Sequence, residues 1–162
     1  MKKFVLFLLM SCPLLLSAQI TDAQTYHDKL IAETRNVADA LNKFNTSLET
    51  DSAYLMHSAR AGLKKQLDTS IAHLTVIGGF KDDDDWCLAL NLQFKFYREC
   101  VDKEYIKFID YSLRLSVLNE DEIADFRRTI EKLNTREVDL AQIEDMAYGE
   151  FVKKYKVKPA EK

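Results

Sequence analysis

Three histidines are the residues of this chain best suited to bind a metal or a cofactor. Helical proteins often bind iron through a glutamate placed three residues before a histidine. In this chain a glutamine, a tyrosine and a serine occupy that position before His27, His57 and His73. The last predicted helix has no histidine for a haem, and the chain has no C-x-x-C-H attachment motif. The sequence therefore predicts no metal site and no cofactor site.

The motifs of common hydrolases and nucleotide-binding enzymes are missing as well. The chain has no G-x-S-x-G, H-E-x-x-H or P-loop sequence, and its four glycines are too few for a glycine-rich nucleotide turn. Cys87 and Cys100 have no histidine close to them in the sequence, although catalytic partners meet in space rather than along the chain. We therefore predict no catalytic residues and no enzymatic activity.

An acidic run at residues 82–85 has the composition of a calcium site. It lacks the alternating D-x-[DN]-x-[DN]-G pattern and the distal glutamate that calcium loops use. The run precedes a predicted helix, where negative charge complements the positive end of the helix dipole. We interpret it as a cap and as dipole compensation, with calcium as the alternative.

The two cysteines of the mature chain, Cys87 and Cys100, are thirteen positions apart. Whether they can form a disulfide tests whether they lie on one continuous helix. On one helix their Cα atoms would lie about 20 Å apart. A disulfide needs Cα atoms within about 7 Å, so no bridge within one chain is expected. Cys87 lies on an apolar stripe and is predicted to be buried, whereas Cys100 is predicted to lie on the flank, open to reaction or to linkage of two chains.

Residues 1–18 have the layout of a secretory signal peptide. Two lysines precede an apolar run over residues 4–16, small residues follow, and cleavage is expected after Ala18. The run contains Pro13 and is shorter than the about 20 residues of a membrane-spanning helix. We predict no transmembrane span, and an exported protein located in the periplasm or outside the cell.

A lipid anchor at Cys12 is the alternative to a discarded signal peptide. The residues from Leu9 to Cys12 resemble the lipobox of bacterial lipoproteins. The apolar region before Cys12 is short, however, and a chain that began there would continue with Pro13 and three leucines, without a polar tether. These features favour a signal peptide that is removed.

The mature chain, residues 19–162, has the length of a single domain. Loss of Lys2 and Lys3 changes its formal charge from −3 to −5. A modestly acidic protein lacks the basic surface that nucleic-acid binding requires, so no nucleic-acid partner is expected. Two remaining cysteines also exclude a disulfide-rich scaffold.

The composition of the mature chain favours long helices. Proline is absent between Gln19 and Lys158, and glycine is rare. Apolar residues recur in steps of three and four, which predicts four helices. They are expected over residues 22–48, 52–77, 84–114 and 120–156. Short connections between long helices favour an all-α, antiparallel up-down-up-down four-helix bundle.

The third of these helices is predicted to be central, because its apolar stripe is rich in aromatic residues that other helices must cover. The stripe consists of Cys87, Leu90, Phe94, Tyr97, Val101, Tyr105 and Phe108. Ile143 is expected to continue the corresponding stripe of the last helix.

Three aromatic motifs carry a resemblance to a known family. They are Phe96-Tyr97, Glu104-Tyr105 and the sequence Phe-Val-Lys-Lys-Tyr at residues 151–155. Their order and spacing resemble a family of uncharacterised helical proteins that Gram-negative bacteria secrete or anchor at their surface. The resemblance covers most of the mature chain. It implies a secreted four-helix domain of unknown role and supplies no catalytic residue.

These observations predict a secreted helical bundle of the cell envelope that is not an enzyme. It is expected to act through surface contacts with an unknown envelope protein or another surface partner. A small-ligand or metal carrier, with its site between helices, is the alternative function. Lysines at positions 153, 154, 156 and 158 complement the dipole of the last helix, with a membrane-surface or partner-binding patch as the alternative.

Overall fold

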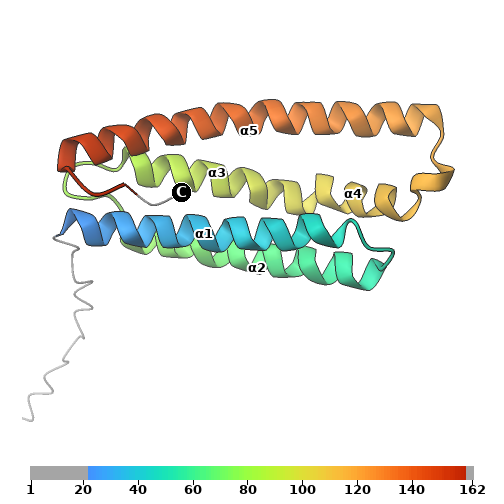
Figure 1. The fold of residues 1–162 in the computed structure, drawn as a ribbon, viewed down its shortest axis with the longest axis horizontal. Coiled ribbons are helices and arrows are strands. Elements are labelled where there is room, and N and C mark those ends of the chain that lie inside the picture. Colours follow the sequence, from blue (N-terminus) through green and yellow to red (C-terminus); the bar gives the residue numbers. More distant parts are fainter. Residues whose placement is uncertain (1–21, 160–162) are drawn as a thin grey trace, which may run out of the picture.

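The computed structural model describes residues 22–159, so the predicted signal peptide and Cys12 lie outside the described residues. Within this range the chain forms five α-helices, and one 3-10 turn joins the last two. α3 and α4 follow one another end to end, and this pair lies lengthwise beside α1, α2 and α5 (Figure 1). The elements are α1 (Ala23–Ser47), α2 (Ala53–Ile77), α3 (Asp85–Asp102), α4 (Glu104–Leu113), η1 (Leu115–Val117) and α5 (Glu120–Tyr155). The predicted all-helical class is confirmed.

Side chains close in sequence set the ends of the first two helices. The Asp22 carboxylate accepts a hydrogen bond from the first turn of α1, and the Ser52 hydroxyl does the same for α2. Such caps satisfy backbone N–H groups that have no partner inside the helix. The last turn of α2 leads into Gly78, whose φ of 63° is readily reached by glycine.

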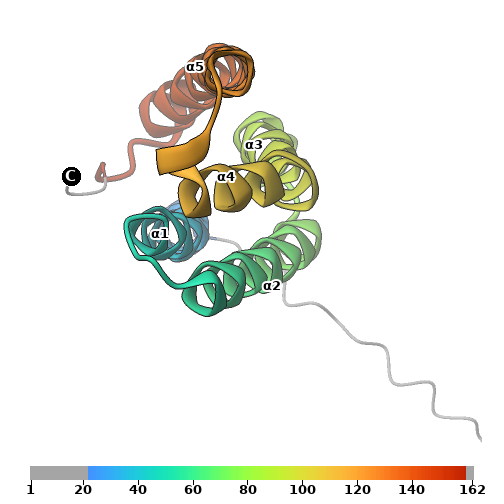
Figure 2. The same cartoon turned by 90° about the vertical axis from the view of Figure 1, so that its right-hand side faces the viewer.

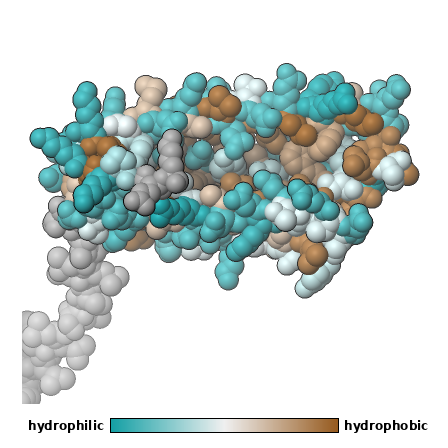
Figure 3. Space-filling view, in the orientation of Figure 1, coloured by the Kyte–Doolittle hydropathy of each residue, from teal (hydrophilic) through white to brown (hydrophobic). Residues whose placement is uncertain are grey.

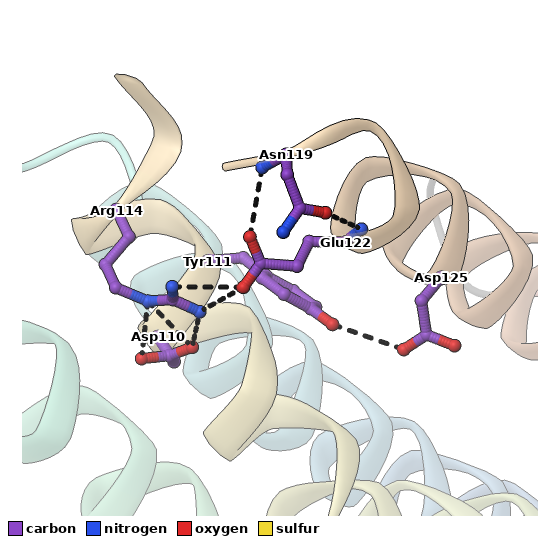
Figure 4. A network of polar contacts seen from close by, with 6 residues as sticks. All are labelled: Asp110, Tyr111, Arg114, Asn119, Glu122 and Asp125. Carbon is purple, nitrogen blue, oxygen red and sulfur yellow. Dashed lines mark hydrogen bonds and ion pairs between the residues drawn. The ribbon is translucent and has the colours of Figure 1, made fainter. Parts of the chain in front are cut away.

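A polar network fixes the start of α5 after the turn from α4 (Figure 4). Asn119 and Glu122 form a reciprocal capping box. The Arg114 guanidinium donates hydrogen bonds of 3.1 Å to the same Glu122 carboxylate. The Tyr111 hydroxyl donates to Asp125 at 3.2 Å. These contacts tie the end of α4 and the first turns of α5 together.

The helix predicted over residues 84–114 is divided at Lys103 into α3 and α4, which corrects the expectation of one continuous helix. The backbone of Lys103 leaves the helical region, with φ −125° and ψ −76°. Arg60 of α2 donates a 2.9 Å hydrogen bond to the carbonyl of Val101, in the last turn of α3. A donor from another helix thus serves a carbonyl at a helix end, where internal partners run out. Beyond the break α4 lies between α1 and α5 when the molecule is seen from this end (Figure 2).

The predicted apolar stripe is buried along α3 but changes after the break. Cys87, Leu90, Phe94, Tyr97 and Val101 are all buried. In α4, Tyr105 and Phe108 are only half-buried, and Ile109 and Tyr111 are the buried residues. The break therefore rotates the apolar side of α4 relative to that of α3.

The long helix α5 lies against α3 and is the least buried helix for its length. Of its 36 residues only Leu140 and Phe151 are buried. Ile143, expected on the inner stripe, is exposed, which corrects that prediction. Glu144 is half-buried instead, and its carboxylate accepts a 2.8 Å hydrogen bond from the Trp86 indole N–H. The hydrogen bond to Trp86 explains how a carboxylate occupies this position.

None of the helices within residues 22–159 combines the length and the apolar character that a membrane span requires.

Candidate functional site

The residue types of a Ser-His-acid set meet between α1 and α2. The Glu33 carboxylate lies between two partners: its Oε2 accepts a 2.6 Å hydrogen bond from the Ser70 hydroxyl, and its Oε1 lies 2.8 Å from Nδ1 of His73. Gln66 donates a further hydrogen bond of 3.0 Å to the Ser70 hydroxyl. Glu33 and Ser70 are buried, whereas His73 is exposed.

The geometry of this set is structural rather than catalytic. In a nucleophilic triad the serine is hydrogen-bonded to the histidine and faces the substrate. Here the Ser70 hydroxyl donates to the carboxylate, and its residue is 0% exposed. Sequence patterns could have revealed this network, because Glu33 follows Leu30 and Ser70 follows Leu67 by three positions, on the apolar sides of their helices. Polar residues at two such core positions indicate a buried polar pair.

The other two histidines are not part of this hydrogen-bond network. His27 is buried, with its ring centroid 5.6 Å from that of Trp86 and 5.8 Å from that of Tyr148. His57 is exposed on α2. Among the residues that the structure describes, no three His, Cys, Asp or Glu side chains gather in a way that could hold a metal ion.

Both cysteines of α3 are free and buried. Burial raises the pKa of the Cys87 thiol, and it raises the pKa of Cys100 to about 12. The prediction for Cys87 agrees with the structure. The prediction that Cys100 lies on the flank, open to reaction, is wrong: its residue is 2% exposed and its thiol is held in the unreactive protonated form.

The acidic run before α3 contributes a turn and an ion pair. Asp84 occupies the cap position, but its side chain makes no capping hydrogen bond, which corrects that part of the interpretation. The Asp83 carboxylate forms a 2.8 Å ion pair with Lys154 of α5. The backbone of Asp83 also forms hydrogen bonds with that of Phe80. One lysine of the C-terminal cluster is therefore engaged with the acidic run.

A groove of about 350 Å³ runs between α3 and α5 on the outside of the helix pair. We call it the α3/α5 groove; its lining consists of Asp85, Leu88, Ala89, Leu92, Ile143, Met146, Ala147 and Glu150. Four of these residues are large apolar side chains that remain exposed, with Leu88 at 53% and Met146 at 69%. The acidic residues Asp85 and Glu150 also line it. The groove thus combines an apolar floor with negative charge.

A second hollow of about 350 Å³ lies between α1, α5 and the junction of α3 with α4. We call it the Tyr97 cleft; it is lined by Ala38, Leu41, Asn42, Asn45, Tyr97, Tyr105, Phe108, Ile130, Leu133, Asn134 and Glu137. In Figure 3 hydrophobic side chains gather below α5 in the half of the molecule nearer η1. Three residues of the predicted aromatic stripe, Tyr97, Tyr105 and Phe108, thus line the cleft.

The Tyr97 cleft contains one carboxyl group, that of Glu137. The Tyr97 hydroxyl donates a 2.6 Å hydrogen bond to Oε1 of Glu137. Burial raises the pKa of Tyr97, and the neighbouring Glu137 raises it further; burial also raises the pKa of Tyr105. Both phenols stay protonated at neutral pH, and Glu137 is the one lining residue with a carboxyl group.

Comparison of the chain with protein-family models, with curated proteins and with solved structures found no match.

Proposed function

We propose that this protein is an exported, non-enzymatic helical protein of the cell envelope that binds a protein partner through the α3/α5 groove. The proposal includes export by the signal peptide and membership of the family that the sequence resembles. It also includes an up-down-up-down four-helix bundle as the arrangement of the helices. In that arrangement α3 and α4 together form one of the four helices of the bundle.

The observation that carries the proposal is the exposed apolar surface of the α3/α5 groove. Leu88 and Leu92 of α3 and Met146 of α5 leave about half or more of their surface in water. Contiguous exposed apolar surface that is bordered by polar residues is typical of interaction sites. Because α5 buries so few residues, most of its length is open to a partner.

The chemistry of the groove defines the kind of partner. A groove between two helices fits the apolar side of an amphipathic helix, whose side chains at steps of three and four fill it. Asp85 and Glu150 would attract basic residues that flank this apolar side. We therefore propose an amphipathic, basic helical segment of an envelope protein as the partner.

Affinity capture from envelope extracts of the native host tests this proposal. Wild-type protein should enrich a partner, and the double variant Leu88→Asp and Met146→Asp should lose it. The matched control is Leu115→Asp with Val117→Asp, which places the same charges on exposed apolar residues of η1. Capture that survives in the groove variant, or the absence of any enriched protein with wild type, would contradict the proposal.

A small-ligand or metal carrier is the second candidate function. The Tyr97 cleft supports a small ligand, since it lies between helices and mixes rings with amides and a carboxylate. Native mass spectrometry and elemental analysis of protein purified from its host distinguish the two candidates. A stoichiometric metal or cofactor would favour a carrier over a protein that acts only through its surface.

A further inference from the structure

We infer that the Tyr97 cleft binds a small organic cation, with Glu137 as its counter-charge and the rings of Tyr105 and Phe108 as its apolar surface. This inference does not depend on the α3/α5 groove, which lies on a different side of α3 and shares no lining residue with the cleft.

The position of the cleft follows from the way the helices pack. α1 packs chiefly against α2, and α5 packs chiefly against α3, so the backbones of α1 and α5 are not close neighbours. Near the other end of the molecule aromatic rings join the two helices, with the centroids of Tyr26 and Phe151 5.2 Å apart. At the end beyond the break at Lys103, α4 lies between α1 and α5 (Figure 2). Side chains from α1, α3, α4 and α5 therefore converge on one hollow, whose volume of about 350 Å³ falls within the range of small-molecule sites.

The charge of the lining selects a cation. Glu137 is the acidic residue of the cleft, and no lysine, arginine or histidine is among its lining residues. Glu137 is exposed to solvent as well as to the cleft. Its carboxylate would repel an anion bound in the cleft, and it would offer a neutral ligand no charge pairing. An ammonium group supplies both the opposite charge and the hydrogen bonds. The Tyr97 hydroxyl already holds one carboxylate oxygen at 2.6 Å, which fixes the orientation of Glu137.

The aromatic residues supply a surface that suits the same class of ligand. Tyr105 and Phe108 both line the cleft. The ring of Tyr105 is held in place by stacking on Phe108, with centroids 5.7 Å apart, and on Phe44, with centroids 4.7 Å apart. Aromatic side chains that line a cleft accept the apolar body of an organic ligand. Amide side chains of Asn42 and Asn134 add neutral hydrogen-bonding groups to the wall. A compact amine with a planar or apolar body satisfies all of these groups.

Titration with a matched pair of probes tests the inference. The cationic probe is 2-phenylethylammonium, and the neutral control of nearly the same shape is 2-phenylethanol. Calorimetry with the mature protein should detect the cation at millimolar or lower concentration. In NMR spectra the side-chain amide signals of Asn42 and Asn134 should shift on addition of the cation. Binding should weaken with added salt because it depends on a charge.

Two variants and one control locate the site. Glu137→Gln keeps an acceptor for the Tyr97 hydroxyl but removes the charge, and should weaken binding of the cation by about tenfold or more. Phe108→Leu keeps an apolar side chain but removes a ring, and should weaken it several-fold. Glu131→Gln removes the same charge from α5 outside the cleft and should leave the affinity within about twofold. Circular dichroism verifies that each variant remains folded.

Three results would overturn the inference. Neither probe binds at millimolar concentration; 2-phenylethanol binds as tightly as the cation; or Glu137→Gln and Phe108→Leu, both folded, bind the cation like wild type.

Discussion

The Ser70 hydroxyl donates a 2.6 Å hydrogen bond to Oε2 of Glu33, and this contact joins α2 to α1 among buried apolar residues. The other oxygen of the same carboxylate lies 2.8 Å from the ring of His73. A buried carboxylate is tolerated only when its oxygens have hydrogen-bond partners. The pairing of α1 with α2 is therefore restricted to the register in which Ser70 and His73 both reach Glu33. The contact therefore adds specificity to a pairing that apolar residues alone would leave less defined.

Replacement of Ser70 by alanine should destabilise the protein, because Oε2 of Glu33 would lose its donor in a buried position. We expect a loss of about 1–3 kcal/mol in the free energy of unfolding, measured by urea denaturation. Ser58→Ala on the exposed side of the same helix is the matched control, with an expected change within about 0.5 kcal/mol. Equal effects of the two substitutions would mean that the Glu33 network does not stabilise the fold.

The buried stripe of α3 predicts a large effect of truncating Phe94, which is 1% exposed. Phe94→Ala should leave a cavity and cost about 3–5 kcal/mol in the free energy of unfolding. Its neighbour Lys95 is exposed, so Lys95→Ala should change stability by no more than about 0.5 kcal/mol. Small and similar losses for both variants in chemical denaturation would show that another side of α3 faces the core.

Glu144 should make stability depend on pH. Burial raises its pKa above the ordinary value of 4.5, while the hydrogen bond from Trp86 acts in the opposite direction. The folded protein therefore holds this proton more tightly than the unfolded chain does. Its contribution to stability is fully present below pH 4.5 and is lost as the pH rises through the raised pKa. Glu144→Gln cannot ionise, so its stability relative to wild type should increase from about pH 4 to about pH 7 in urea unfolding.

The fluorescence of Trp86, the only tryptophan, gives a second measurement of the same group. Ionisation of a carboxyl that accepts its indole N–H should change the emission, with a midpoint above pH 4.5 in wild type. The transition should be absent in Glu144→Gln. A transition that persists in this variant would assign the titration to another group.

The two thiols should be protected in the folded protein. Cys87 and Cys100 are buried, and burial raises the pKa of both. Reaction with a thiol reagent at about pH 8 should be slow in buffer and fast in urea, because the thiolate is the reactive form. Rapid labelling of Cys100 in the folded protein, or a dimer linked through it, would contradict its buried position.

Local signals in the sequence determined where three of the five described helices begin and where α2 ends. Asp22, Ser52 and Asn119 lie immediately before α1, α2 and α5, and Gly78 follows the last residue of α2. A cap depends on hydrogen bonds between residues about three positions apart, so a short stretch of sequence is sufficient to specify it. The apolar stripe of α3 was readable for the same reason, since it repeats within one helix.

Contacts between distant residues decided the rest. The break at Lys103 accompanies a hydrogen bond from Arg60 to the carbonyl of Val101, forty-one positions away. No sequence pattern within residues 84–114 predicts this break. The burial of Cys100, the inward position of Glu144 and the meeting of Tyr97 with Glu137 also depend on which helix lies opposite. Helical periodicity defines an apolar side only to within about one residue on either flank, so flanking positions are assigned by the neighbouring helices. The Tyr97 cleft combines stripe residues of α3 and α4 with side chains of α1 and α5, so only the tertiary structure could reveal it.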